Sequence, residues 1–355
     1  MGLKSVIIDS IGSANHSVGK TLSNILEIDQ LLISKLLYCT PSVLFKEIDE
    51  EQSLKIEDFL TQLGLLVKVQ NKEEPLPELP ELFELAIYID DVRNLPEVNK
   101  TLSDFLGCSE QDSLKLLLTD PGIVLGGVSV STAKALQDRI NAEIIISNPL
   151  TDLYTLIITA EDESLIKEII KILKSRSIQT EPNQSVFDNI DYQTSQKIWS
   201  RFQHTGKIQI INQSFQRFEI LLQEFDIENK EQKACLIHEV GMPHNILYVL
   251  SNNLPVILDE SVDRKTLLEK MDIYLMAGLK CTYYPLLFQN YKIIIHEINN
   301  YEATNEVVKL FFPEEKNHEV KEKWISPTTM NHLLTRYVAQ ILEDVGCSLE
   351  IKRVE

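Results

Sequence analysis

One glycine position recurs along the chain, and it constrains the fold more than any other feature. The glycine follows a helical apolar pattern and precedes an alternating apolar stretch at Gly64, Gly206, Gly278 and Gly346. These glycines are spaced 142, 72 and 68 residues apart, and the first interval holds two copies because the copy ending near "INAEIIISN" has no glycine. Glycine ends a helix in the left-handed conformation without steric cost. The sequence therefore predicts a repeated folding element of about 70 residues.

A second alignment relates the first two copies at an offset of 80 residues. The stretch "VGKTLSNIL", from Val18, matches "VNKTLSDFL", from Val98, and the same offset pairs Pro41 with Pro121. The matched positions keep the apolar face of a helix. They indicate that both copies share a fold.

Each copy opens with a short stretch rich in β-branched residues, such as "SVIID" or "YKIIIHEI". One or two amphipathic helical patterns follow, then a proline-marked apolar segment, a third helix, the glycine and a closing strand. We therefore predict an α+β protein, a tandem array of about five small strand-helix-helix-strand-helix-strand repeats with helices on one face of each sheet. Because such a repeat is near the lower size limit for an independent core, neighbouring repeats are expected to pack on one another.

The copies predict the domain boundaries. We expect repeat 1 at 1–70, a proline-rich linker at 71–82, repeat 2 at 83–149, repeat 3 at 150–213, repeat 4 at 214–284 and repeat 5 at 285–355. The alternating prolines of the linker, "NKEEPLPELPEL", favour an extended spacer, and a docking site for a proline-binding groove is the alternative. The copies are expected to diverge at a polar loop, "SIQTEPNQSVFDN", and at a charged loop, "FFPEEKNHEVKEKW".

Composition narrows the class of protein. The 355 residues are 44% apolar and 25% charged, as in soluble globular proteins. The formal charge of −19 repels phosphate backbones, so nucleic-acid binding is not expected. No apolar run approaches the ~20 residues of a membrane span, and no leader pattern is evident. The five cysteines are scattered without a CxxC pair, which argues against a disulfide scaffold or a zinc ribbon. We expect a cytoplasmic protein without membrane insertion.

The segment from Ala14 to Thr21 resembles a degenerate phosphate-binding P-loop, with Ala14, four residues and then Gly-Lys-Thr. A working P-loop cradles phosphate with the amides of a glycine-rich turn. Here Ala14 replaces the first glycine, and the second copy has Asn99 in place of Gly19 while keeping Lys100. A capped helix start, with Ser13, Asn15 or Ser17 as the cap, therefore explains the pattern better. A nucleotide-binding enzyme that uses residues 14–21 stays open as an alternative.

No metal, cofactor or catalytic site is predicted. His238 and His244 flank "EVGMP", but six residues across a glycine and a proline is not a zinc spacing. No Ser or Cys lies in a nucleophile-elbow context, and no acid–base pair is recognisable. We therefore expect a non-enzymatic protein.

The first repeat, read from "SANHSVGKTLSNIL" to "DFLTQLGLLVKVQ", resembles the C-terminal domain of the bacterial ribosomal stalk protein. Ala14, Asn15 and Lys20 fall at that family's loop and first-helix positions. The adaptor that feeds substrates to the Clp protease is similar in fold, and "GCSEQDSLKLLLTDPGIVLGGVSVSTAKALQDRI" resembles both families. The resemblance implies partner contacts on the first two helices of a repeat. It also implies that Asp90 and Asp91 correspond to the adaptor's acidic pocket.

These observations predict a protein-interaction scaffold or adaptor. The candidate partner-binding residues are Asn15, Lys20, Lys100, Asp90 and Asp91. The partner is expected to be a protein. A third interpretation is a self-assembling structural component, either a homo-oligomer or a subunit of a larger complex.

Overall fold

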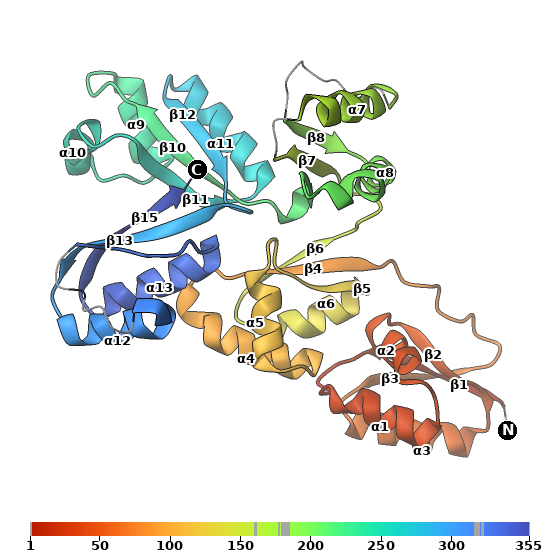
Figure 1. Cartoon of the computed structure of the whole chain (residues 1–355). Helices are drawn as coiled ribbons and strands as arrows, with labels where there is room; N and C mark the ends of the chain where they lie inside the picture. The colour runs from red at the N-terminus through yellow and green to blue at the C-terminus, as the bar shows by residue number, and fades with distance from the viewer. Residues whose placement is uncertain are drawn as a thin grey trace. The chain divides into compact units, whose positions relative to one another are not determined.

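Five small three-stranded sheets follow one another along the described part of the chain (Figure 1), so the structure is the predicted α+β tandem array. The computed structural model describes residues 2–159, 162–176, 178, 185–315, 320 and 323–354. In every sheet the first strand of the repeat is central, flanked by the second and third strands. Parts of the two loops predicted to diverge, 177, 179–184, 316–319 and 321–322, lie outside the described residues.

Repeats 1, 2 and 4 place two main helices between their first two strands. The elements of repeat 1 are β1 (Lys4–Ser10), α1 (Ser17–Leu26), α2 (Gln30–Tyr38), β2 (Ser42–Ile48), α3 (Glu50–Gln62) and β3 (Leu66–Asn71). Those of repeat 2 are β4 (Phe83–Tyr88), η1 (Val92–Asn94), α4 (Leu95–Leu106), α5 (Glu110–Leu118), β5 (Ile123–Val128), α6 (Val130–Gln137) and β6 (Glu143–Ser147). Those of repeat 4 are β10 (Phe218–Glu224), α9 (Lys230–His238), η4 (His244–Ile246), α10 (Leu247–Ser251), β11 (Val256–Val262), α11 (Arg264–Met276) and β12 (Lys280–Pro285).

Repeats 3 and 5 have one long helix there among the described residues. Repeat 3 consists of β7 (Tyr154–Ile158), α7 (Glu163–Lys174), β8 (Val186–Ile190), α8 (Tyr192–Phe202), η2 (Gln203–Thr205), β9 (Ile208–Asn212) and η3 (Gln213–Phe215). Repeat 5 consists of β13 (Asn290–Ile298), α12 (Tyr301–Phe311), η5 (Pro313–Glu315), β14 (Trp324–Ile325), α13 (His332–Asp344) and β15 (Cys347–Val354).

In repeats 1 to 4 the second strand is connected to the third helix by the same local backbone structure. A bulge shifts the strand register near the end of the second strand, and one residue there adopts a left-handed conformation. The residues with positive φ are Glu47, Gly127, Asn189 and Ser261. Two positions later an extended residue precedes the helix, and in repeats 1, 3 and 4 it is an aspartate that accepts a hydrogen bond from a backbone N–H of the first turn. This shared corner is independent structural evidence that the repeats are copies.

The predicted closing glycines are confirmed. Gly64, Gly206, Gly278 and Gly346 have φ values of 89°, 64°, 75° and 95°, in the left-handed region. In repeat 2 the third helix has only 8 residues, against 13 in repeat 1. The missing glycine of repeat 2 therefore coincides with a third helix that ends early, and the chain enters β6 without a left-handed glycine.

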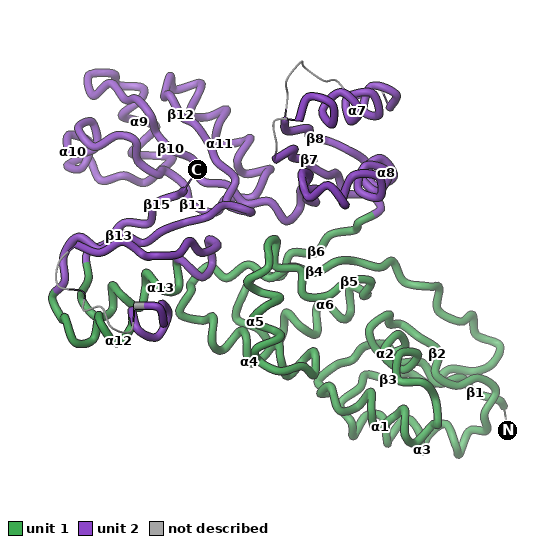
Figure 2. The backbone as a smooth tube through the Cα atoms, viewed as in Figure 1, with its two compact units in different colours: residues 1–149, 299–307, 336–347 green, residues 150–298, 308–335, 348–355 purple. Residues whose placement is uncertain are grey.

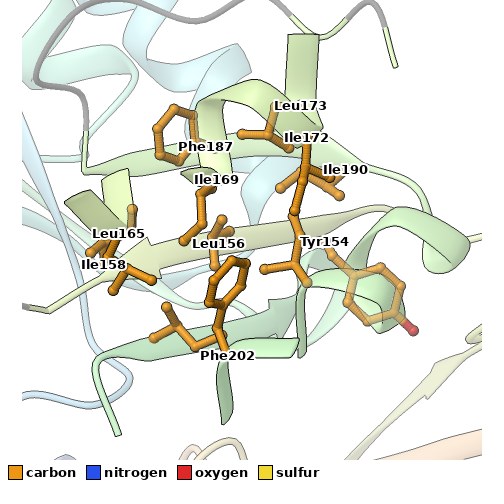
Figure 3. Close-up of a cluster of buried hydrophobic side chains, with 12 residues drawn as sticks. Tyr154, Leu156, Ile158, Leu165, Ile169, Ile172, Leu173, Phe187, Ile190 and Phe202 are labelled. Carbon is orange, nitrogen blue, oxygen red and sulfur yellow. The ribbon is translucent and has the colours of Figure 1, made fainter. Parts of the chain in front are cut away.

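Each core lies between a sheet and its helices. In repeat 3 the apolar side chains of α7 and α8 gather over β7 and β8 (Figure 3), with Leu156, Ile169 and Leu173 fully buried. Burying an aliphatic side chain contributes about 1.5–3 kcal/mol each. The helical apolar spacing recognised in the sequence thus becomes the inner face of each repeat.

The chain divides into two compact units (Figure 2). One contains residues 1–149, 299–307 and 336–347, and the other contains residues 150–298, 308–335 and 348–355. Repeat 5 contributes to both, because parts of α12 and α13 group with repeats 1 and 2. Among the described residues, no helix combines the length and apolar character needed to cross a membrane.

Candidate partner-binding surface on the first repeat

Asn15 organises the start of the first helix. Its Oδ1 accepts hydrogen bonds from the backbone N–H of Ser17 at 2.9 Å and from the Ser17 hydroxyl at 2.5 Å. This local Asx turn explains the motif "NHS" before α1 in structural terms. The amide acceptor of Asn15 is therefore engaged within the protein.

Lys20 and Lys100 occupy the same place on α1 and α4. Both are exposed. Neither side-chain ammonium group has a hydrogen-bond or ion-pair partner among the residues that the structure describes, although the Lys100 carbonyl oxygen accepts from the Ser103 hydroxyl. They stay predicted partner-binding residues, one on each of the first two repeats.

Asp90 and Asp91 lie at the end of β4, where both take part in local structure. Asp91 Oδ1 accepts from the backbone N–H of Arg93 at 3.0 Å, which begins η1. The carbonyl oxygen of Asp90 accepts from Arg336 of α13, which also donates to the carbonyl oxygen of Ile89 at 3.2 Å. Within the described chain, no hydrogen bond or ion pair joins these acids to Asn15, Lys20 or Lys100. The five predicted residues therefore do not form one hydrogen-bonded site.

Several amides in and beside the P-loop-like segment are engaged within the protein. The N–H of Ser13 donates to the carbonyl oxygen of Gly64 at 2.9 Å, and that of Ala14 donates to Ile11 at 3.0 Å. The N–H of Ser17 is capped by Asn15 as described above. A phosphate cradle needs such amides free to point at the ligand. The geometry of this loop is that of a helix start.

Repeat 2 packs tightly on repeat 1 through residues that the sequence did not single out. The start of α6 reaches the end of α2, where the Thr132 hydroxyl donates to the carbonyl oxygen of Tyr38 at 2.8 Å. The hydroxyls of Thr40 and Ser131 are 2.6 Å apart. Arg139, just after α6, donates to the carbonyl oxygen of Gly12 in repeat 1. Only the prediction that neighbours pack on one another anticipated this contact.

The last turn of α4 is covered by repeat 1. The Phe105 ring lies 6.1 Å from the Tyr38 ring between centroids, and Arg139 stacks 4.9 Å above it. The Tyr38 hydroxyl donates to the carbonyl oxygen of Phe105 at 3.2 Å. Phe105 is therefore only 2% exposed. Burial of the Tyr38 hydroxyl raises its pKa.

The equivalent turn of α1 is uncovered. Ile25, the counterpart of Phe105 at the offset of 80 residues, is 57% exposed. Leu31 and Leu32, which begin α2 beside it, are 75% and 56% exposed. We call Ile25, Leu31 and Leu32, three exposed apolar residues around the turn between α1 and α2, the hairpin patch. Their exposure distinguishes repeat 1 from repeat 2, where the counterparts of the two leucines are Gln111 and Asp112.

The residues that cap α4 and α1 also differ between the two repeats. Gly107 ends α4 with φ 72°, and a Cβ there would lie 2.7 Å from the Cβ of His16. Glu27 ends α1 with φ 55°, so the same left-handed cap carries a side chain in repeat 1. Repeat 2 requires glycine at this cap because repeat 1 approaches it closely.

No family model, no curated protein and no solved structure matches this chain.

Four of the five cysteine thiols have raised pKa values. Burial raises the pKa of Cys39, Cys108 and Cys235, and it raises the pKa of Cys281 to about 11. A nucleophilic cysteine needs the opposite shift. No cluster of three or more potential metal-ligating His, Cys, Asp or Glu side chains occurs in the part of the chain that the structure describes. The hairpin patch is therefore the strongest candidate site.

Proposed function

We propose that this chain is a non-enzymatic protein-interaction scaffold or adaptor, and that a protein partner docks on the hairpin patch of repeat 1. One observation carries the proposal. The helix end that repeat 2 buries at Phe105 is left exposed in repeat 1, where it carries Ile25, Leu31 and Leu32. An exposed apolar face of this kind is typical of a protein interface.

The energetic scale is adequate for a specific contact. Full burial of each aliphatic side chain contributes about 1.5–3 kcal/mol. Much of that gain offsets the loss of translational and rotational freedom on association. The three side chains therefore suit the centre of a reversible interface. The resemblance to two families that bind protein partners through small α+β domains points the same way.

Affinity capture from the native host tests the proposal. The wild-type chain should retain a partner that the double variant Ile25→Asp, Leu31→Asp loses. The matched control is Leu275→Asp, Met276→Asp, an apolar pair at the end of α11 that is at least as exposed. An identical set of captured proteins for both variants would contradict the assignment of the hairpin patch.

Self-assembly is a second candidate, and the same surface favours it. The hairpin patch corresponds to a surface that already makes a contact between two repeats, so a second copy of the chain could occupy it. Sedimentation equilibrium of the pure protein distinguishes the two. A monomer at micromolar concentration supports an adaptor, whereas oligomers that dissociate in the Ile25→Asp, Leu31→Asp variant support self-assembly.

The nucleotide-dependent enzyme has a direct test. Titration with labelled ATP and GTP should detect no magnesium-dependent binding to the wild-type chain. Micromolar binding that disappears in Lys20→Ala but survives in Lys100→Ala would replace the scaffold proposal with this alternative.

A further inference from the structure

The sheet of repeat 1 has an open edge at β2. The strand order is β2-β1-β3, so β2 has a neighbour on one side only. No backbone hydrogen bond links residues 42–48 to a segment other than β1 within the described chain. An edge strand of this kind is a template for a further strand, because alternate N–H and C=O groups point away from the sheet.

The proline-rich linker forms a wall on one side of this edge. Gln70 Nε2 donates to the carbonyl oxygen of Pro75 at 3.3 Å. Gln70 pairs with Ser5, and Val43 pairs with Ile7, so these four side chains share one face of the sheet. Leu76 lines the same hollow as Val43. The linker therefore lies along the sheet face of repeat 1, in addition to connecting repeats 1 and 2.

Helix α2 forms the opposite wall. Leu32, Lys35, Leu36 and Cys39 line the hollow, at the i, i+3, i+4 and i+7 spacing of one helix face. Together α2, β2 and residues 76–79 of the linker enclose about 490 Å³. We call this hollow the edge groove. Strand β2 lies between a helix and an extended segment, with its free edge in the groove.

The charge of the edge groove is opposite to that of the whole chain. Lys35 and Lys46 line it, both are exposed, and neither has an ion pair among the residues that the structure describes. Glu78 is the single acidic residue in the lining, whereas the chain carries a formal charge of −19. Unpaired lysines beside apolar side chains favour a ligand that combines carboxylates with aliphatic groups.

We propose that the edge groove binds an extended, leucine-containing acidic peptide segment, which adds to β2 as a fourth strand. Its main chain would hydrogen-bond to the free edge of β2. Alternate side chains would then point to opposite sides, so leucines on one side meet Leu76 and Leu79 of the linker while glutamates on the other side reach Lys35 of α2 and Lys46. The inference rests on the proposed function, since it assigns a class of protein partner. It uses a second surface, which shares only Leu32 with the hairpin patch.

Fluorescence anisotropy with the full chain tests the edge groove. The probe is a labelled eight-residue peptide of alternating Glu and Leu, and the comparison peptides are alternating Lys and Leu and an N-methylated Glu–Leu version that lacks alternate N–H groups. We expect dissociation constants on the order of 10 μM for the acidic peptide and at least about tenfold weaker binding of both comparison peptides. Equal binding of the N-methylated peptide, or no binding of the acidic peptide, would overturn strand addition.

Matched variants locate the binding site. The double variant Lys35→Glu, Lys46→Glu should weaken binding of the acidic peptide about tenfold or more. The double variant Lys171→Glu, Lys174→Glu changes the net charge equally at exposed sites of α7, outside the groove, and should leave binding unchanged. Equal losses in both double variants would indicate attraction to net charge and contradict the groove. Circular dichroism of each variant checks that it folds.

Hydrogen exchange provides a readout of strand pairing. Amides within residues 42–48 should exchange more slowly when the acidic peptide is bound. Oleate at the same concentration tests whether the apolar lining takes an acyl carboxylate instead, and displacement of the peptide without protection of β2 would overturn the proposal. If partner capture depends on Ile25 and Leu31 but the acidic peptide does not bind, the edge groove is rejected and the hairpin patch is retained. Capture independent of Ile25 and Leu31 would reject the hairpin patch whatever the peptide does.

Discussion

Tyr274 donates its hydroxyl hydrogen to a carboxylate oxygen of Asp259 inside the core of repeat 4. The other carboxylate oxygen of Asp259 accepts from Lys270, one helical turn before Tyr274. Asp259 is only 10% exposed at its side chain. Burial, and then the hydrogen bond to Asp259, raise the pKa of Tyr274. Repeat 3 has apolar residues at the three equivalent positions, Phe187, Ile198 and Phe202.

Removal of Asp259 alone should destabilise repeat 4. Asp259→Ala leaves Lys270 and the Tyr274 hydroxyl without their shared acceptor in a largely buried place. We expect a loss of about 2–4 kcal/mol in the free energy of unfolding, measured by urea denaturation. The triple variant Asp259→Phe, Lys270→Ile, Tyr274→Phe carries the residues of repeat 3 and should be as stable as the wild type or more so. A triple variant less stable than Asp259→Ala would contradict this account.

Cys281 should make stability fall in mild alkali. Burial raises its pKa from 9.0 to about 11, so the folded chain keeps the proton that the unfolded chain releases. Stability from this group is fully present below pH 9 and is lost as the pH rises to 11, by on the order of 2 kcal/mol. Cys281→Ala should flatten the fall in that window. Thr282→Ala, next on the same strand, should shift stability equally at every pH and keep the slope.

The close approach of His16 to Gly107 predicts a position-specific glycine effect. Gly107→Ala should cost more than Gly206→Ala, because both have positive φ but a Cβ at Gly206 meets no atom within 4 Å. We expect about 1 kcal/mol at Gly206 from the backbone alone, and roughly 1–3 kcal/mol more at Gly107 from the clash. Urea denaturation measures both. His16→Gly, which removes the Cβ that would clash, should recover part of the loss in the Gly107→Ala background, and additive effects would exclude the clash.

Arg139 should stabilise the contact between repeats 1 and 2. Arg139→Ala removes both the hydrogen bond to the carbonyl oxygen of Gly12 and the stacking on Phe105, for an expected loss of about 2–3 kcal/mol. Arg139→Lys keeps the charge but lacks the planar group that stacks, so it should recover only part of the loss. Hydrogen exchange should show faster exchange at α4 and at residues 12–18. Exchange confined to other segments would show that Arg139 does not hold this interface.

The repeated architecture could be predicted from the sequence because the signals that specify it are local. A helix that closes on a left-handed glycine repeats the same short-range sterics at Gly64, Gly206, Gly278 and Gly346 in any surroundings. The Asx turn at Asn15 is local in the same way. The fold class and the first-helix start could therefore be predicted from the chain. The proposed roles of Lys20 and Lys100 remain predictions, because an exposed lysine carries no signal for its partner.

Tertiary structure alone decided which helix face is covered. "VGKTLSNIL" and "VNKTLSDFL" have one apolar pattern, yet Phe105 is buried and Ile25 is exposed. Periodicity reports which side of a helix is apolar, and it does not report what packs against that side. The contact of Arg139 with Gly12 joins residues far apart in sequence, and the edge groove exists only because the linker folds back along a sheet. The amino-acid sequence determines that the folding element is repeated, whereas the packing of the copies determines which surfaces are left free for partners.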